Sequence, residues 1–371
     1  DGVMATLLPR LTMLCRLAAK GGVGLNIDAE EADRLDLSLD VIEAALEDGE
    51  LVGWDGFGVV VQAYGPRAGF VIDWLHALAT RLDRRIMVRL VKGAYWDTEI
   101  KRAQVMGLDG FPVFTHKQAT DVSYIANARK LLGHTDRIYP QFATHNAHTV
   151  AAILDMADDQ SAFEFQRLHG MGERLHDIVL KTEKTRCRIY APVGAHRDLL
   201  AYLVRRLLEN GANSSFVNQI VDEDVPAAEV ASDPFAELEG LSFPAVTHPA
   251  DIFPGRKNSK GWDWTDPHDM AAIDRARDVY RGEQADSEPL MAVASAGAEN
   301  RKVQAPAAPH DRVGTVRLAT AQDAAAATQA AQPWTASAAD RAAVLIKAAD
   351  LYEANMGRIF ALLAREAGKT M

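Results

Sequence analysis

Cysteine is scarce in this sequence, with two residues, Cys15 and Cys187, in a chain of 371. So few thiols exclude a disulfide framework and a cysteine-rich metal cluster, and they are typical of a reducing compartment. Long apolar runs are missing too, since none approaches the about 18 residues that a membrane-spanning helix needs. No secretory signal opens the chain. We therefore expect a cytoplasmic protein with no transmembrane segment.

Positive charge is also in short supply. Lysine and arginine number 40 against 51 acidic residues, a formal net charge of −11. This balance argues against a nucleic-acid surface on this segment and favours small ligands. A hydrophobic fraction of 48% and a charged fraction of 25% are ordinary for a globular protein.

From residue 21 onward, short β-rich runs alternate with helical stretches, a pattern that builds a parallel sheet with crossover helices. The sequence predicts a helix over 4–19 and then seven strands, over 23–27, 58–63, 86–91, 113–116, 138–144, 163–167 and 188–191. The helices expected to follow them are 29–47, 68–82, 97–106, 121–132, 147–158, 172–182 and 197–210. Seven units predict a distorted (β/α)8 barrel of the TIM type that lacks its first strand. A doubly wound open sheet is the competitor, but no G-x-G-x-x-G fingerprint follows the first strand.

Three regions are expected along the chain. Residues 1–222 form the barrel. Residues 223–315 read as an extended linker arm, partly ordered near Trp262 and Trp264, because nine of the fifteen prolines lie between Pro226 and Pro309. Residues 316–371 are alanine-rich and helical over 316–331, 338–354 and 358–367, and read as the opening of a further domain. The chain thus reads as a piece of a longer protein.

Polar residues at strand ends are the candidate site, because ligands of a parallel barrel bind there. Arg89 lies between Val88 and Leu90, so we expect it to face an anion, a carboxylate or an electron-rich ring. Gln62 ends a β-branched run and needs a hydrogen-bond partner, from a ligand or a loop carbonyl. Asp28 is as well explained as the N-cap of the next helix, with Glu31 completing a capping box, as by a binding role.

The segment that follows Arg89 has the composition of a cofactor site. Lys92 offers charge, or simply extends out of the barrel mouth. Gly93 lets backbone approach a ligand, and Tyr95 and Trp96 offer flat rings, with Trp96 expected to be half-exposed.

Two further strand ends carry chemistry-bearing side chains. His145 is a candidate general base next to Asn146, a candidate helix cap, but no metal-ligand spacing surrounds it, so no metal site is expected. In the helix over 197–210, Arg205 and Arg206 are either part of a solvated face with an Arg205–Glu209 pair or a bidentate clamp for a carboxylate.

Taken together, these segments resemble the proline dehydrogenase domain of the bifunctional proline utilization A flavoenzymes. The motifs that carry the resemblance are NIDAEEADRLDLSLD at 26–40, VVVQAYG at 59–65, RLVKGAYWDTEIKRAQ at 89–104, FATHNAHT at 142–149, FEFQRLHGMGE at 163–173, RIYAPVG at 188–194 and YLVRRLLENGANSSFVNQI at 202–220. The end of the chain, with REAGKT at 365–370, is similar to the start of an aldehyde dehydrogenase domain.

The resemblance implies that FAD oxidises L-proline to 1-pyrroline-5-carboxylate by hydride transfer to flavin N5, and that electrons pass to a membrane quinone. It implies a cytoplasmic, homo-oligomeric parent protein that associates peripherally with the inner membrane during turnover. NAD would serve the aldehyde dehydrogenase half, which oxidises the product onward to glutamate. That half is incomplete here, since no cysteine follows Cys187 and its nucleotide site is missing.

The resemblance also implies roles for individual residues. Arg89, near flavin N5, Asp28 and Tyr190 would be catalytic, and Arg205, Arg206, Tyr95, Leu168 and Tyr190 would bind proline. The residues expected to hold FAD are Gln62, Arg89, Lys92, Gly93, Ala94, Trp96, Thr115, Lys117, Thr120, Thr144, His145, Gln166 and Glu209. A substrate-binding lysine of the family lies on the first barrel strand, upstream of Asp1.

Two other functions stay open from the residues alone. One is a barrel lyase without flavin, in which Lys92 forms a Schiff base. The other is an inactive scaffold in which the helix of Arg205 and Arg206 and the linker arm serve assembly with partner chains.

Overall fold

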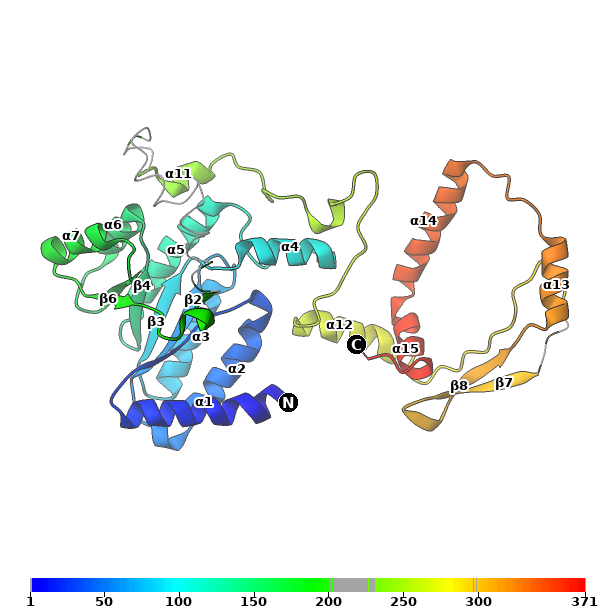
Figure 1. Ribbon diagram of the computed structural model, residues 1–371, viewed down its shortest axis with the longest axis horizontal. Coiled ribbons are helices and arrows are strands. Elements are labelled where there is room, and N and C mark those ends of the chain that lie inside the picture. Colours follow the sequence, from blue (N-terminus) through cyan, green and yellow to red (C-terminus); the bar gives the residue numbers. More distant parts are fainter. Residues whose placement is uncertain are drawn as a thin grey trace. The chain divides into compact units, whose positions relative to one another are not determined.

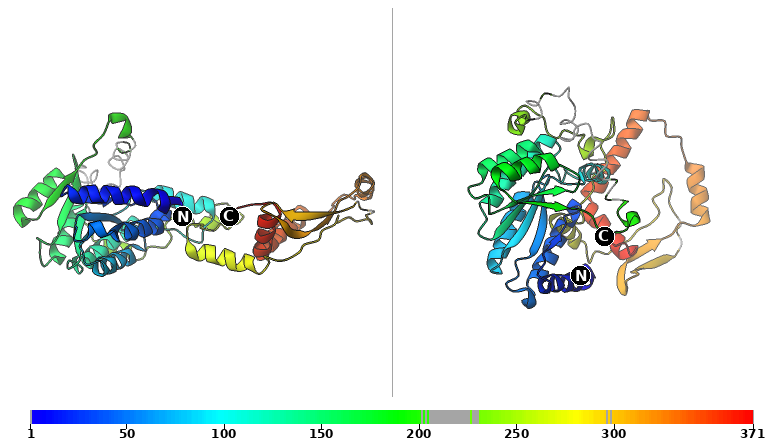
Figure 2. Two further views of the ribbon diagram at one scale, coloured as in Figure 1. Left: turned by 90° about the horizontal axis from the view of Figure 1, so that it is seen from below. Right: turned by 60° about the vertical axis from the view of Figure 1, so that its left-hand side comes forward.

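We analysed a computed structural model of the chain, which describes residues 2–200, 202, 204, 226, 231–295, 297 and 299–370. The chain divides into two compact units, Asp1–Trp262 and Asp263–Met371 (Figures 1 and 2).

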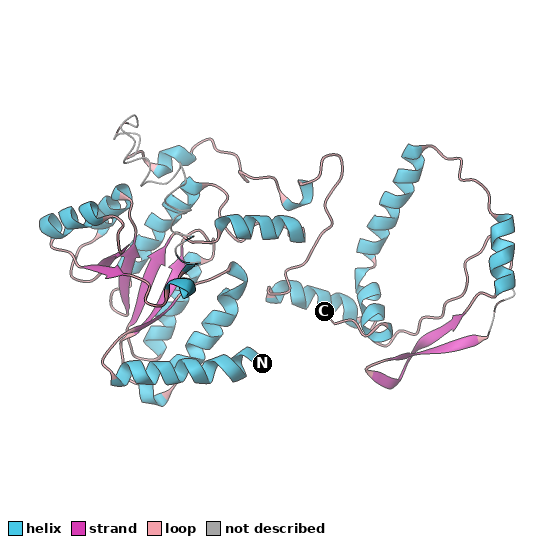
Figure 3. Cartoon of the chain, viewed as in Figure 1, coloured by secondary structure: helices cyan, strands magenta, loops and turns pink. Residues whose placement is uncertain are grey.

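The first unit is built on a curled parallel sheet, drawn in magenta in Figure 3. Its six strands follow one another in chain order. The strands are β1 (Leu25–Ile27), β2 (Phe57–Gln62), β3 (Ile86–Val91), β4 (Ile138–Ala143), β5 (Glu164–Leu168) and β6 (Cys187–Tyr190). Each pairs in parallel with the next. The structure thus confirms an α/β half-barrel, while the paired strands of the described part number six and not the expected seven.

Helices connect the strands. They are α1 (Gly2–Lys20), α2 (Leu35–Leu46), α3 (Ala68–Arg81), α4 (Trp96–Met106), α5 (Lys117–Leu132), α6 (Ala147–Met156) and α7 (Glu173–Glu183), with short 3-10 turns η1 (Ala32–Arg34), η2 (Gly49–Leu51) and η3 (His196–Asp198). The main core includes buried side chains from α2, α3 and α5 together with one face of the sheet. Because side chains alternate along a strand, Val88 and Leu90 lie in this core whereas Arg89 points to the opposite, concave face.

The segment 113–116 is not a strand, so this prediction was wrong. Val113 is buried in a small separate cluster with Tyr64 and Ile100. The N–H of Phe114 makes one hydrogen bond of 2.8 Å to the carbonyl of Tyr64, beyond the end of β2. The apolar residues here pack next to α4. A short run of β-forming residues does not distinguish such packing from a strand.

Helix α1 is more apolar than we expected. Its 19 residues include a window of mean hydropathy 1.2, enough by length and composition to cross a membrane. Polar and small residues divide the helix into short apolar runs, but the mean hydropathy of the whole window stays at that value. In the structure only Cys15 and Ala18 of this helix are buried. The helix contacts α2 and η2, and Arg16 pairs with Asp48 at 2.5 Å and with Glu50 at 2.7 Å.

The predicted linker arm contains regular structure in both units. The first unit includes α11 (Pro234–Leu238) and η4 (Pro249–Asp251), and the second includes α12 (Pro267–Asp278), β7 (Asn300–Ala305) and β8 (Ala308–Arg317). Helix α12 corrects the expectation that this proline-rich stretch forms no helix. Pro267 is its first residue, where a missing N–H costs nothing, and the Asp266 side chain caps it by accepting from the His268 N–H at 2.8 Å.

The second unit ends in three helices, α13 (Ala321–Ala330), α14 (Ala338–Ala354) and α15 (Met356–Glu366). Helix α15 packs on α12, and Arg365 pairs with Asp311 of β8 at 2.8 Å. Helix α14 buries none of its residues. Of the helical stretches predicted from the alanine-rich sequence, 338–354 matches α14 and 358–367 nearly matches α15. The prediction over 316–331 began five residues too early, since residues 316 and 317 belong to β8 and α13 begins at Ala321.

Candidate active site

Arg89 is the centre of the candidate site, on the concave face of β3. Its guanidinium forms an ion pair with Asp28, just past β1, and lies 5.3 Å above the ring centre of Tyr190, the last residue of β6. The side chain of Arg89 is 12% exposed, whereas that of Asp28 is 70% exposed. Both expected kinds of partner, a carboxylate and an electron-rich ring, are therefore present. The sheet brings together Asp28, Arg89 and Tyr190, which lie far apart in the sequence.

Asp28 does not cap a helix. The turn η1 begins at Ala32 with Glu31 at its N-cap position, and Arg34 holds that position for α2. Neither cap residue makes a side-chain cap hydrogen bond. The capping alternative for Asp28 and Glu31 is therefore wrong, and the pairing with Arg89 accounts for the carboxylate.

The loop after β1 links two neighbouring parts of the site. Gln62, at the end of β2, donates from Nε2 to the carbonyl of Glu30 at 2.7 Å. The Glu30 carboxylate in turn accepts a hydrogen bond from the hydroxyl of Tyr95. Gln62 therefore has a loop carbonyl as its partner, which is one of the two kinds of partner expected. Sequence reasoning missed Glu30, although it lies in the motif at 26–40.

The segment after β3 is held in one conformation. Lys92 pairs with Asp121 of α5, and the indole N–H of Trp96 donates to the carbonyl of Phe114 at 2.7 Å. Gly93 has φ +137°, and a Cβ there would lie 2.5 Å from the Tyr64 ring, so glycine is required at this position. Ala94 is exposed and Trp96 half-buried, as expected for the tryptophan.

Three candidate cofactor residues lie around the start of α5. The hydroxyl of Thr115 accepts a hydrogen bond of 3.0 Å from the N–H of Ala245, a contact that the sequence could not predict across 130 residues. Thr120 is buried, and Lys117, the first residue of α5, is exposed.

His145, between β4 and α6, lies beside the end of β5. Its Nε2 accepts from the backbone N–H of Leu168 at 3.2 Å, so this nitrogen carries no proton in the observed arrangement. The Thr144 hydroxyl accepts from the N–H of Asn146 at 3.1 Å, and the carbonyl of Thr144 accepts from His176 Nε2 at 3.0 Å. Asn146 caps α6 by accepting from the N–H of Thr149, which confirms that expectation.

We expect His176 to make the stability of the chain pH-dependent. It is 1% exposed, and burial lowers its pKa below the usual value of about 6.5. As pH falls through that value, the unfolded chain takes up a proton that the folded chain does not, so stability decreases with acidification. The pH dependence of the melting temperature between about pH 7 and about pH 5 should be shallower in His176→Gln, which cannot titrate.

The matched control for this measurement is His268→Gln, at an exposed position on α12. It should keep the pH dependence of the unchanged chain. Parallel curves for the unchanged chain and His176→Gln would contradict the assignment.

Sequence reasoning missed a buried carboxylate on the concave face. Glu164 of β5 is 4% exposed and accepts hydrogen bonds from Gln141 Nε2 and Gln166 Nε2, both at 2.9 Å. Arg188 of β6 donates to it from two nitrogens, at 2.7 and 3.0 Å. Strands β4, β5 and β6 are therefore joined by side chains as well as by backbone. The signal was the period-two pattern of 163–168, in which Glu164 and Gln166 share a face.

A small apolar pocket opens beside the site. It lies between the ends of β1 and β2 and helices α2 and α3, and Asp28, Gln62 and Tyr64 contribute to its wall. Neither Arg89 nor Tyr190 lines it, so the chemistry expected at Arg89 belongs to the concave face and not to this pocket.

Three predicted site residues, Arg205, Arg206 and Glu209, lie outside the described residues. Their roles, and the functional roles of the other site residues, stay predictions.

Comparison with known proteins matches two separate stretches of the chain. The family model described as proline dehydrogenase matches residues 1–219, and the model of the aldehyde dehydrogenase family matches residues 293–371. The bifunctional protein PutA of Escherichia coli is 48% identical over 394 residues, covering 100% of this chain and 30% of that protein. Its counterpart in Rhizobium meliloti is also 48% identical, covering 99% of this chain and 31% of that protein.

Solved structures agree with these relatives. A crystal structure of a mutant proline utilization A from Bradyrhizobium japonicum superposes with a TM-score of 0.85 at 46% identity, covering 99% of this chain and 35% of that one. The protein from Bdellovibrio bacteriovorus, inactivated by N-propargylglycine, gives 0.84 at 30% identity, covering 100% and 39%. The chain spans about a third of the length of these proteins. The resemblance inferred from the motifs is confirmed, and the chain belongs to the proline dehydrogenase family, followed by the beginning of an aldehyde dehydrogenase region.

Proposed function

We propose that the first unit oxidises L-proline to 1-pyrroline-5-carboxylate with FAD as cofactor. The observation that carries this proposal is the cluster of Arg89, Asp28 and Tyr190 at the carboxyl ends of the strands. A cation held there by a carboxylate and an aromatic ring is suited to stabilise negative charge that develops on a reduced cofactor.

The residues present fit a flavin. The Nε of Arg89 is buried and has no hydrogen-bond partner among the described residues, so a donor is available for an acceptor atom of a ligand. The side chains that would hold FAD are Gln62, Arg89, Lys92, Trp96, Thr115, Lys117, Thr120, Thr144, His145 and Gln166, with the backbone at Gly93 and Ala94, and with Glu209 by the family motif.

The chemistry requires little acid or base catalysis. Oxidation of the neutral amine removes a hydride from C5, the ring carbon next to nitrogen that does not carry the carboxylate, and releases a proton from nitrogen to water, which leaves a C=N bond. FAD, when bound, would accept the hydride. Asp28 orients the Arg89 guanidinium through their ion pair. Tyr95, Leu168 and Tyr190 would enclose the proline ring and exclude water, and Arg205 and Arg206 would bind its carboxylate bidentately.

The parent protein would pass electrons to a membrane quinone. We propose a cytoplasmic homo-oligomer that associates with the inner membrane during turnover, and an NAD-dependent second half that oxidises the product to glutamate. The two family matches along the chain support the pairing of a proline dehydrogenase with an aldehyde dehydrogenase. The quinone, the homo-oligomer and the membrane association are proposed from the family resemblance alone.

The absorbance spectrum of the purified parent protein tests the proposal. We expect the bands of an oxidised flavin, and we expect L-proline without oxygen to bleach them while L-alanine leaves them unchanged. A folded protein that binds no FAD would contradict the cofactor, and a flavin that proline does not bleach would contradict the substrate.

The lyase alternative is less well supported by the geometry. A Schiff-base lysine must present its amine to a carbonyl substrate, whereas the Nζ of Lys92 is engaged in an ion pair with Asp121. Borohydride trapping at Lys92 in the presence of a carbonyl substrate would favour the lyase, and unchanged proline binding by Arg206→Ala would favour the scaffold.

A further inference from the structure

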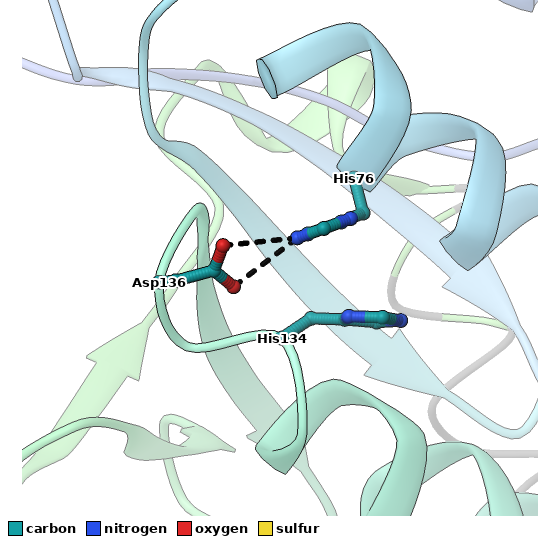
Figure 4. Close-up of side chains that lie close together, drawn as sticks. All are labelled: His76, His134 and Asp136. Atoms are coloured by element: carbon teal, nitrogen blue, oxygen red, sulfur yellow. Dashed lines mark hydrogen bonds and ion pairs between the residues drawn. The ribbon is translucent and has the colours of Figure 1, made fainter.

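Two histidines and an aspartate lie together at the amino-terminal edge of the sheet. His76 lies on α3, and His134 and Asp136 lie in the turn 133–137 that leads into β4 (Figure 4). One ligand atom of each residue lies within 4.8 Å of the other two. The proposed proline chemistry uses the opposite ends of the strands, so it does not explain this cluster.

The backbone on both sides of the cluster is fixed. Helix α3 buries Ile72 and Leu75 in the core, which sets the position of His76. In the turn, the carbonyl of His134 accepts from the N–H of Ile138 at 2.8 Å and from that of Arg137 at 3.1 Å. Binding of a ligand here would therefore restrict only side chains and not the backbone, so the entropic cost of binding is low.

The side chains already face one another. His76 Nε2 lies 3.1 Å from each carboxylate oxygen of Asp136, the contact drawn with dashed lines in Figure 4. The His134 ring stacks on the His76 ring with 4.2 Å between centroids and 23° between planes.

A second carboxylate lies behind His134. Asp73 of α3 is 3.5 Å from His134 Nε2 and accepts a 2.6 Å hydrogen bond from Lys130. With the Nε2 of His134 directed toward Asp73, Nδ1 is the nitrogen that remains for a metal ion. A carboxylate that orients a ligating histidine in this way is a common feature of metal sites in proteins.

Two imidazoles and one carboxylate are a donor set that zinc prefers. Ligand atoms of a tetrahedral zinc site lie about 3.4 Å apart, given bonds of about 2.0 to 2.1 Å. Asp136 is 63% exposed and both histidines are about a quarter exposed, so the three side chains have room to rotate toward that spacing. Within the described ranges, no other three His, Cys, Asp or Glu residues are reported at this spacing.

We propose that His76, His134 and Asp136 bind Zn²⁺ or a similar first-row divalent cation, with water completing the coordination. The bound ion would join α3 to the turn before β4. At the amino-terminal face of a barrel such a link contributes to stability and not to catalysis. The proposal does not depend on the flavin or on proline.

Zinc titration of the untagged full chain, in competition with a chromophoric chelator near neutral pH, tests the site. We expect one Zn²⁺ to bind per chain, and binding to weaken at least about tenfold in His134→Gln and in Asp136→Asn. His268→Gln, at an exposed histidine of α12, should leave the affinity unchanged. Co²⁺ in place of zinc should give the visible absorption of a nitrogen- and oxygen-ligated tetrahedral ion.

Thermal unfolding gives an independent measurement. Zn²⁺ should raise the melting temperature of the unchanged chain and of His268→Gln, but not that of His134→Gln, whose circular dichroism without metal should match the unchanged chain. Equal zinc affinity in the unchanged chain and in both cluster variants would overturn the proposal, as would a failure of the unchanged chain to bind zinc.

Discussion

Arg89→Met is expected to lower the proline-dependent turnover of the parent protein by about 10²–10³, which corresponds to about 2.7–4 kcal/mol of transition-state stabilisation. The guanidinium lies at the strand ends, 12% exposed and paired with Asp28. Low exposure strengthens its interaction with charge that develops on a bound cofactor. Methionine keeps the length of the side chain and removes the charge. Turnover is measured with a dye as electron acceptor, so that quinone docking does not enter.

Arg89→Lys separates charge from geometry. Lysine keeps the charge but cannot pair with Asp28 and lie above Tyr190 in the same way, so we expect only partial recovery of turnover. The matched control is Arg81→Met on α3, where an exposed arginine pairs with Glu43 and Glu47 and contacts no site residue. Full activity in Arg89→Met with a normal flavin spectrum would remove Arg89 from the mechanism.

The parallel sheet could be predicted because its strands carry strong local signals. The bounds of β3, residues 86–91, match the prediction, since an apolar alternation there is closed by Gly93. The segment 113–116 is also rich in residues that favour strands, but no described strand of the sheet pairs with it. Pairing is a long-range property that a local pattern does not contain. The short strand β1 was likewise predicted two residues too long at its start.

The partners of the site residues were harder to predict than the residues themselves. The sequence indicated that Arg89 needs an acid or a ring, but the choice of Asp28 and Tyr190 depends on the order of strands in the sheet. Gln62 similarly required some acceptor, and the fold supplies Glu30. The hydrogen bond from Ala245 to Thr115 joins segments 130 residues apart and has no local signal. Burial costs identify residues that need partners, and topology decides which partners they find.

Glu164 should matter as much for stability as Arg89 does for turnover. We expect Glu164→Leu to lower the free energy of unfolding of the first unit by about 3 kcal/mol. Leucine would leave the buried amide donors of Gln141 and Gln166 without their acceptor. It would also unpair Arg188, but that side chain is 59% exposed, so water compensates for part of the loss. The midpoint of urea unfolding, followed by tryptophan fluorescence, measures the change, because Trp54 and Trp74 pack against the core.

Two further variants separate the charge of Glu164 from its hydrogen bonds. Glu164→Gln keeps an acceptor oxygen and loses the charge, so we expect about half the effect of leucine. Glu173→Gln, at a 60% exposed carboxylate 3.6 Å from Arg167, should change stability by less than about 0.5 kcal/mol. If Glu164→Leu unfolds at the same urea concentration as the unchanged chain, the side-chain network does not stabilise the sheet. If Glu164→Gln and Glu164→Leu lower the free energy of unfolding equally, the charge of Glu164 accounts for the effect. The amide hydrogen bonds then add little, because a glutamine at this position could still accept one of them.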